Sequence, residues 1–240
     1  MNVGELLEEL RENLLRDVSD VVGSDVGHLF TDKSLVRYLD EAHKKAARRS
    51  QCIRDAKTPE ITTLTLTQGV SAYEMSSRII RVLSVSYGAD RRYRPLKQAS
   101  LYDITDRTSD YVGAMPCGTY VDEGVPTHYT VDEGSNYLRL FKAPGAELEG
   151  ETLHMRVVRL PAKDFTLNDL KATPEIPEDY HLDLVDWAAF RALRNHDVDA
   201  ENLQKANPHR ASFNAAMAEL SRETRRKYFE PFMFGGFTTD

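Results

Sequence analysis

Residues 174–196, PEIPEDYHLDLVDWAAFRALRNH, constrain the fold most strongly, because two prolines precede an alanine-rich helix that carries the chain's single tryptophan. Each proline fixes its own backbone angle and disfavours helical geometry in the residue before it, so the helix cannot begin earlier. From about Leu182 the apolar residues recur at helical spacing and share one face. These residues are Leu182, Val185, Ala188, Ala189, Ala192 and Leu193.

Trp187 and Phe190 project from the opposite side of this helix, since each residue turns the helix by about 100°. The alanines permit close approach of a partner helix in the same chain. The two aromatic rings need a second surface, which is another helix, an inserted domain or another subunit. The alternative is that both faces are buried within one chain.

The bulk composition excludes several classes of protein. A chain of 240 residues with a net charge of −7 has enough length for a real core, and its charge argues against general coating of nucleic acid. It does not exclude DNA passing nearby. Cys52 and Cys117 lie far apart without a CxxC pair, so neither a disulfide framework nor a zinc site is predicted. No apolar run approaches a membrane span, and the acidic, amphipathic N-terminus is unlike a signal peptide.

Two helices are predicted before residue 57. The first carries an apolar stripe from Val3 to Val18 and ends at Gly23. The second begins at Thr31 or Asp32, either of which can cap it, and Phe30 can form a hydrophobic staple with Leu35 if Thr31 is the cap. The buried stripe of the second helix is Leu35, Tyr38, Leu39, Ala42 and Ala46.

Four basic residues crowd the last turns of the second helix: Lys44, Lys45, Arg48 and Arg49. A basic helix end is usually explained by compensation of the helix dipole and by solvation. The alternative is a patch that contacts an acidic neighbour or passing DNA.

From about Lys57 the apolar period changes from helical to alternating. Leu64 and Leu66 alternate with threonines, and Leu83, Val85 and Tyr87 alternate with serines. Further strands are predicted at 137–141 and 153–160, with weaker candidates at 111–112 and 128–131 and a short helix at 101–106. The glycines and prolines between them are typical of a small antiparallel sandwich or barrel. Helical patterning resumes at about Asp164.

The C-terminal part is predicted to contain a last helix and an apolar tail. Asn207 and Pro208 suit an N-cap and first turn, which predicts a break or kink there. The helix after it carries Phe213, Ala216, Met217 and Leu220 on one side. The apolar tail either folds back on its own bundle or docks as an extended arm into a groove on a partner. Its apolar residues are Tyr228, Phe229, Phe232, Met233, Phe234 and Phe237, preceded by Arg222, Arg225, Arg226 and Lys227.

The sequence contains no case for catalysis, and no metal or cofactor is predicted. Phosphate-binding loops, nucleophile elbows and zinc-protease motifs are all absent. His181 and His196 lie 15 residues apart on one helix, which is about 22 Å and too far to share an ion. The nearest approach to a metal constellation is His181, Asp183, Asp186, His196, Asp197, Asp199 and His209.

Three segments, in order along the chain, carry a resemblance to a known family. They are TDKSLVRYLDEAHKKAARR, PTHYTVDEGSNYLRLFKAPG and PEIPEDYHLDLVDWAAFRAL, and together they span residues 31–193. With these segments the chain resembles the head–tail connector (adaptor) proteins of tailed bacteriophages, most closely those of short-tailed phages.

The resemblance implies a structural virion protein at the head–tail junction, assembled in the host cytoplasm. Such proteins form a ring, typically dodecameric, beneath the portal protein, extend the DNA channel for genome retention and ejection, and give the tail or nozzle protein its docking surface. DNA passes through the channel without sequence-specific binding, and no membrane is involved. A DNA-binding module that uses Lys44, Lys45, Arg48 and Arg49 is the alternative.

The expected fold class is α+β, with a helical bundle built from both ends of the chain, an inserted antiparallel β-sandwich or barrel-like domain and an extended C-terminal arm. The bundle covers residues 1–56 and 162–227 and forms the ring, the insertion covers 57–161, and the arm covers 228–240. We expect Trp187, Phe190 and Arg194 at the subunit interface. The portal-binding residues are expected to be Arg225, Arg226, Tyr228, Phe229, Phe232, Met233, Phe234 and Phe237.

Overall fold

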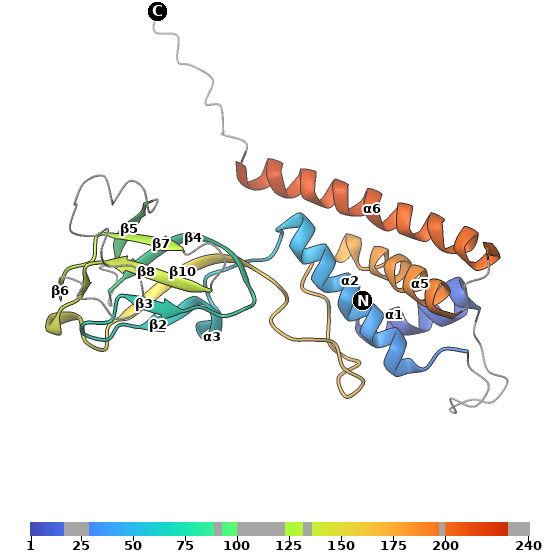
Figure 1. Cartoon of the computed structure of the whole chain (residues 1–240). Helices are drawn as coiled ribbons and strands as arrows, with labels where there is room; N and C mark the ends of the chain where they lie inside the picture. Colours follow the sequence, from blue (N-terminus) through green and yellow to red (C-terminus); the bar gives the residue numbers. More distant parts are fainter. Residues whose placement is uncertain (17–28, 89–92, 100–122, 132–135, 197–199, 230–240) are drawn as a thin grey trace, which may run out of the picture. The chain divides into compact units, whose positions relative to one another are not determined.

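The computed structural model describes residues 1–16, 29–88, 93–99, 123–131, 136–196 and 200–229, without the side chains of 195–196, 200–203 and 229. The chain divides into two compact units (Figure 1). The helical unit comprises Met1–Ile53 and Pro161–Asp240, and the β unit comprises Arg54–Leu160. Each is described by itself below. The predicted short helix at 101–106, the weak strand at 111–112 and Cys117 lie outside the described residues.

The first helix of the helical unit begins at Val3, the first residue of the predicted apolar stripe. α1 spans Val3–Glu9 and begins with a capping box, in which the Asn2 side chain accepts a hydrogen bond from the Glu5 amide and the Glu5 side chain accepts one from the Asn2 amide. It continues as a π-helical segment, η1, over Leu10–Leu15, and Arg16 ends it in the left-handed conformation at φ 51°. The predicted extension to Val18 and Gly23 falls outside the described residues.

The second helix, α2, spans Asp32–Ser50 and confirms the predicted stripe. Thr31 is its N-cap, since its hydroxyl oxygen accepts a hydrogen bond from the Ser34 amide at 3.3 Å. Phe30 and Leu35, the two residues of the predicted staple, are both buried. The stripe residues Leu35, Tyr38, Leu39, Ala42 and Ala46 are buried as well.

An irregular segment, 161–182, connects the β unit to α5, and the predicted return of helix at Asp164 is wrong. Its regular structure is one 3-10 turn, η4, over Glu178–Tyr180. The segment is held to α2 instead: the Phe165 amide donates to Asp40 Oδ1 at 3.0 Å, and the Glu175 amide donates to His43 Nε2 at 2.9 Å. The Phe165 ring also stacks on the His43 ring at 4.7 Å. These bonds satisfy backbone groups that a helix would otherwise pair internally.

The central helix, α5, spans Asp183–His196 and packs against α2 and α6. Its alanine face is buried as predicted, but Leu182 is 53% exposed. Leu182 precedes the first helical residue, so the helical periodicity that placed it on the buried face does not apply there.

The last helix, α6, spans Ala200–Phe229 and runs without a break through Pro208. The prediction was a break or a kink at Asn207 and Pro208, and the break is wrong. A proline inside a helix loses one backbone hydrogen bond, and a kink stays a prediction. Buried residues on both sides of the proline, Ala206 and Phe213, hold the two parts against the core. Among the described residues, no helix combines the length and apolar character that crossing a membrane requires.

The β unit contains one large sheet in the described residues. Its strand order is β1-β10-β4-β5-β7-β8-β3, and β2 also pairs with β10. A short helix, α3, spans Pro59–Thr62, and a 3-10 turn, η3, spans Ala146–Leu148. The strands are β1 Arg54–Asp55, β2 Thr63–Thr65, β3 Ala72–Glu74, β4 Ile79–Tyr87, β5 Arg94–Gln98, β7 His128–Val131, β8 Tyr137–Phe141 and β10 Thr152–Arg159, and a separate pair consists of β6 Glu123–Gly124 and β9 Ala143–Pro144.

The sheet is mixed, so the prediction of a purely antiparallel domain is wrong. β5 pairs with β7 in parallel, with Lys97 opposite His128, and β6 pairs with β9 in parallel. Parallel neighbours need a long connection, which residues 99–127 supply between β5 and β7. Alternation of side chains predicts strands but carries no information on their direction.

A β-bulge corrects the predicted face of β4. Ser84 lies opposite Arg156 and Val82 lies opposite Val157, so Leu83 is an extra residue without a partner in the ladder. The bulge buries both Val82 and Val85, and Leu83 is half-buried instead of sharing the inner face with Val85.

Candidate functional site

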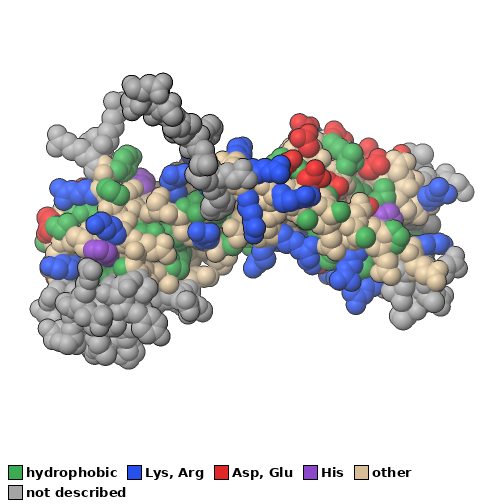
Figure 2. Space-filling view, turned by 90° about the horizontal axis from the view of Figure 1, so that it is seen from above, with side chains coloured by type: hydrophobic (Ala, Val, Ile, Leu, Met, Phe, Trp, Pro, Cys, Tyr) green, Lys and Arg blue, Asp and Glu red, His purple; other side chains and the backbone are tan. Residues whose placement is uncertain are grey.

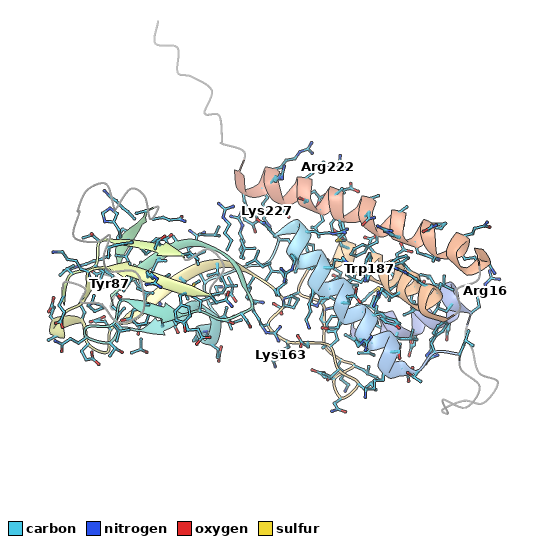
Figure 3. The ribbon with its side chains drawn as sticks, viewed as in Figure 1. Arg16, Tyr87, Lys163, Trp187, Arg222 and Lys227 are labelled. Atoms are coloured by element: carbon cyan, nitrogen blue, oxygen red, sulfur yellow. The ribbon has the colours of Figure 1, made fainter. Side chains whose placement is uncertain are left out.

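Trp187 lies in the interior of the helical unit, among α2, α5 and α6 (Figure 3). Its ring centre is 5.2 Å from those of Phe190 and Phe213, and the Lys45 ammonium lies 3.7 Å from it. Trp187 is 6% exposed and Phe190 4%. The aromatic face that needed a second surface is therefore covered by the same chain, which is the alternative left open by the sequence.

The basic end of α2 makes contacts within its own chain. Lys44 Nζ lies 2.7 Å from Asp40 Oδ2 and 2.9 Å from Asp164 Oδ1. Burial alone would lower the pKa of Lys44, but hydrogen bonds with these two carboxylates raise it above its usual value. Arg49 donates a hydrogen bond to the Asn214 side chain, and Arg48 is exposed. Three of the four predicted DNA-facing residues thus have partners in the helical unit.

Further arginines join this end of α2 to form one positively charged surface, which we call the basic face. The Arg194 and Arg210 guanidinium groups lie 6.0 Å and 5.7 Å from the centre of the Phe190 ring. Arg191 Nε lies 3.1 Å from Glu41 Oε2, so one carboxylate shares this surface. The basic face consists of Lys45, Arg48, Arg49, Arg191, Arg194 and Arg210.

The cations of the basic face lie close enough to affect one another. Burial lowers the pKa of Lys45, and the nearby Glu41 carboxylate raises it. The guanidinium groups of Arg49, Arg191 and Arg210 lower it further. Lys45 therefore lies close to three other cations and to the Glu41 carboxylate.

A second charged surface, which we call the acidic face, lies beside the start of α5 and consists of Asp183, Glu219 and Glu223. Glu219 and Glu223 are exposed and four residues apart on α6. Burial raises the pKa of Asp183, and the nearby Asp186 and Glu219 carboxylates raise it further. Burial also raises the pKa of Tyr180, and its hydrogen bond to Glu223 adds to that shift.

A family model described as SU10 adaptor protein matches residues 1–233. The chain belongs to the SU10 adaptor protein family. No curated protein matches the sequence. The β unit and the basic and acidic faces lie within the matched residues.

Membership in the SU10 adaptor family makes the chain a structural adaptor protein of a bacteriophage and a component of the virion. The family is not known for enzymatic activity. The resemblance to phage adaptor proteins is thereby confirmed at the level of the family, and the closer likeness to short-tailed phages stays a prediction.

The histidine and aspartate set has structural contacts in this adaptor. His181 Nε2 lies 3.0 Å from the Ile176 carbonyl oxygen, and His209 Nδ1 lies 2.7 Å from Asp186 Oδ1. Within the described ranges no three His, Cys, Asp or Glu side chains form a group that could hold a metal ion. The His196 side chain, Asp197 and Asp199 lie outside the described residues.

The start of the predicted portal-binding arm is the end of α6. Arg222 and Lys227 lie on its last turns (Figure 3), and Arg225 and Arg226 are exposed. Tyr228 is 40% exposed, with Lys227 Nζ 5.4 Å from its ring centre. The Phe229 side chain and residues 230–240, which include Phe232, Met233, Phe234 and Phe237, lie outside the described residues.

Sequence reasoning missed the two charged faces as surfaces. Arg191, Arg210 and Glu219 were not singled out, because each is unremarkable among its neighbours in the chain. The pair Glu219 and Glu223, four residues apart and next to the buried Leu220, was a signal that could have been found.

Proposed function

We propose that this SU10 family adaptor forms a ring between the portal and the tail of the virion. The ring extends the DNA channel, so that the protein takes part in genome retention and ejection. The observation that carries the proposal is the family match over residues 1–233. The portal protein, the tail or nozzle protein and further copies of the chain are its proposed partners, and the site of action is the head–tail junction.

The helical unit is the part proposed to build the ring. Its core is completed within one chain, because Trp187 and Phe190 are buried between its own helices. The Trp187 and Phe190 side chains therefore belong to the core beneath the proposed interface. The contact between subunits is made by exposed residues such as Arg194. Because assembly does not have to bury exposed core residues, charged groups on the surface can control it.

The C-terminal arm is proposed to bind the portal protein. Exposed basic residues on the last turns of α6, Arg225 and Arg226, lead into a terminal segment that is dense in aromatic residues. Aromatic anchors flanked by arginines are typical of segments that dock into a groove on a partner.

Deletion of Phe229–Asp240 tests the arm, with co-purification of the adaptor and its portal protein as the measurement. The truncated chain should keep the circular dichroism spectrum and melting temperature of the full chain and lose the portal. A matched control replaces Phe232, Phe234 and Phe237 by serine, which keeps the length of the arm and removes its anchors. Undiminished portal binding by both variants would show that the arm is not the binding element.

A further inference from the structure

The two charged faces lie on opposite flanks of α6. Phe213 and Leu220 mark the buried stripe of this helix. At about 100° per residue, Asn214, which accepts the hydrogen bond from Arg49, lies on one side of the stripe, and Glu219 lies on the other. Figure 2 shows Asp and Glu side chains gathered along one edge of the helical unit and Lys and Arg side chains along the opposite edge.

Each face brings like charges together within one folded chain. The basic face sets six cations from three helices beside the carboxylate of Glu41. On the acidic face, Asp183, Glu219 and Glu223 surround Tyr180, and burial with like charge raises the pKa of Asp183. Repulsion within each face lowers the stability of an isolated chain and is relieved by a partner surface of the opposite sign.

Leu182 adds an apolar contact to the acidic face. It is 53% exposed and directly precedes Asp183. An exposed large apolar side chain beside a charged residue suits a protein–protein contact, in which a small apolar centre is rimmed by polar groups.

We propose that the basic face of one copy of this chain binds the acidic face of the next copy, head to tail. The inference rests on the proposed ring and names the surfaces that build it. A heterologous contact of this kind uses two different patches on every copy, and it generates a closed ring when the rotation between copies closes. Both patches are present on one helical unit, so each copy can contact two neighbours.

Duplex DNA is the competing occupant of the basic face. It would pair with the cations of Arg194 and Arg210, but it leaves the acidic face without a role. The net charge of −7 also disfavours DNA binding by the whole chain.

Two charge-reversal variants of the full-length chain test the pairing. E219K/E223K makes the acidic face positive. R48E/R194E/R210E makes the basic face negative, because Lys45, Arg49 and Arg191 then lie beside three new carboxylates and Glu41. Each variant alone should associate about 100-fold more weakly than wild type, because every contact between its copies then joins like charges. An equimolar mixture should assemble again, because alternating copies place opposite charges at every contact. Analytical ultracentrifugation of each sample, alone and with the portal protein, measures the result.

The control is E8K/E12K, which reverses two exposed glutamates at the same spacing on another part of the helical unit and should assemble like wild type. Circular dichroism checks that every variant is folded. Assembly of both single variants at wild-type strength would overturn the inference and leave the proposed ring in place. A folded mixture that stays unassembled would also overturn it. So would a DNA mobility shift that R48E/R194E/R210E abolishes while E219K/E223K assembles normally. Wild type that stays monomeric with and without portal would overturn the proposed ring itself.

Discussion

The ammonium group of Lys45 lies 3.7 Å from the centre of the Trp187 ring, which joins the last turns of α2 to the middle of α5. A cation over an aromatic face is held by the ring quadrupole. Lys45, which the sequence predicted as a DNA-facing residue, thus packs on the core of the helical unit.

Trp187→Ala should lower the free energy of unfolding by about 3–5 kcal/mol, because it removes a buried indole ring and leaves a cavity. Trp187→Phe should cost much less, since the ring face under Lys45 is kept. The buried indole nitrogen has no hydrogen-bond partner among the described residues, so its removal breaks no bond. Urea denaturation followed by circular dichroism measures both values. Equal losses for the two variants would contradict a packing role.

Asp55→Asn should destabilise the β unit by about 3 kcal/mol, because it breaks a buried ion pair. Asp55 Oδ2 lies 2.6 Å from Arg159 Nε, and the two side chains are 7% and 9% exposed. The Asp55 carboxylate also accepts hydrogen bonds from the Lys57 and Thr58 amides. Thermal unfolding of the variant beside wild type tests the size of the loss, and a change below about 1 kcal/mol would contradict it.

The same pair predicts a dependence of stability on pH. Burial alone would raise the pKa of Asp55, but its hydrogen bonds, including that from Arg159, hold it well below the usual range. The folded state thus has the lower pKa, and the pair's contribution is complete above the unfolded pKa of about 4 and declines as the pH falls below it. Wild type should lose stability between about pH 5 and pH 2 more steeply than Asp55→Asn. Parallel pH profiles would refute this.

Thr31→Ala should lower the free energy of unfolding by about 1 kcal/mol, because the Ser34 amide loses its capping acceptor. Thr31→Ser keeps a hydroxyl acceptor and is the matched control, expected within a few tenths of wild type. Chemical denaturation of the three proteins under one condition compares them. A serine variant as unstable as the alanine variant would point to the lost methyl group instead of the cap.

Little DNA binding is expected from the isolated adaptor. Lys44, Lys45 and Arg49 make contacts within the chain, and Arg48 is exposed. A mobility-shift assay with duplex DNA at about 50 mM salt should show no retarded band. A salt-sensitive shift that Arg48→Glu abolishes would favour the DNA-binding alternative.

Local patterns predicted the helices of the helical unit well where a single rule decides the structure. The stripe from Leu35 to Ala46 is buried and Thr31 caps α2, because helical spacing and capping depend on residues within a few turns. The same rules failed at Asp164, where backbone bonds to Asp40 and His43 replace helix, and at Pro208, where packing on both sides keeps α6 continuous.

The β unit shows a similar limit. Alternation identified β4 and β10, but the bulge at Leu83 and the parallel pairing of β5 with β7 were not predicted. Both depend on the partner strand, and a strand's own residues do not say which neighbour it has or in which direction that neighbour runs.

By itself the sequence determined the buried stripes of the helices, the mixed α+β class and the resemblance to phage adaptor proteins, because these depend on local spacing and on motifs. Only the tertiary structure decided that Trp187 is covered by Lys45 and Phe213 of its own chain. It also decided that charges from α2, α5 and α6 gather into two faces of opposite sign. Periodicity gives the angle of a side chain around its helix axis, whereas the neighbour that it meets depends on how distant segments pack.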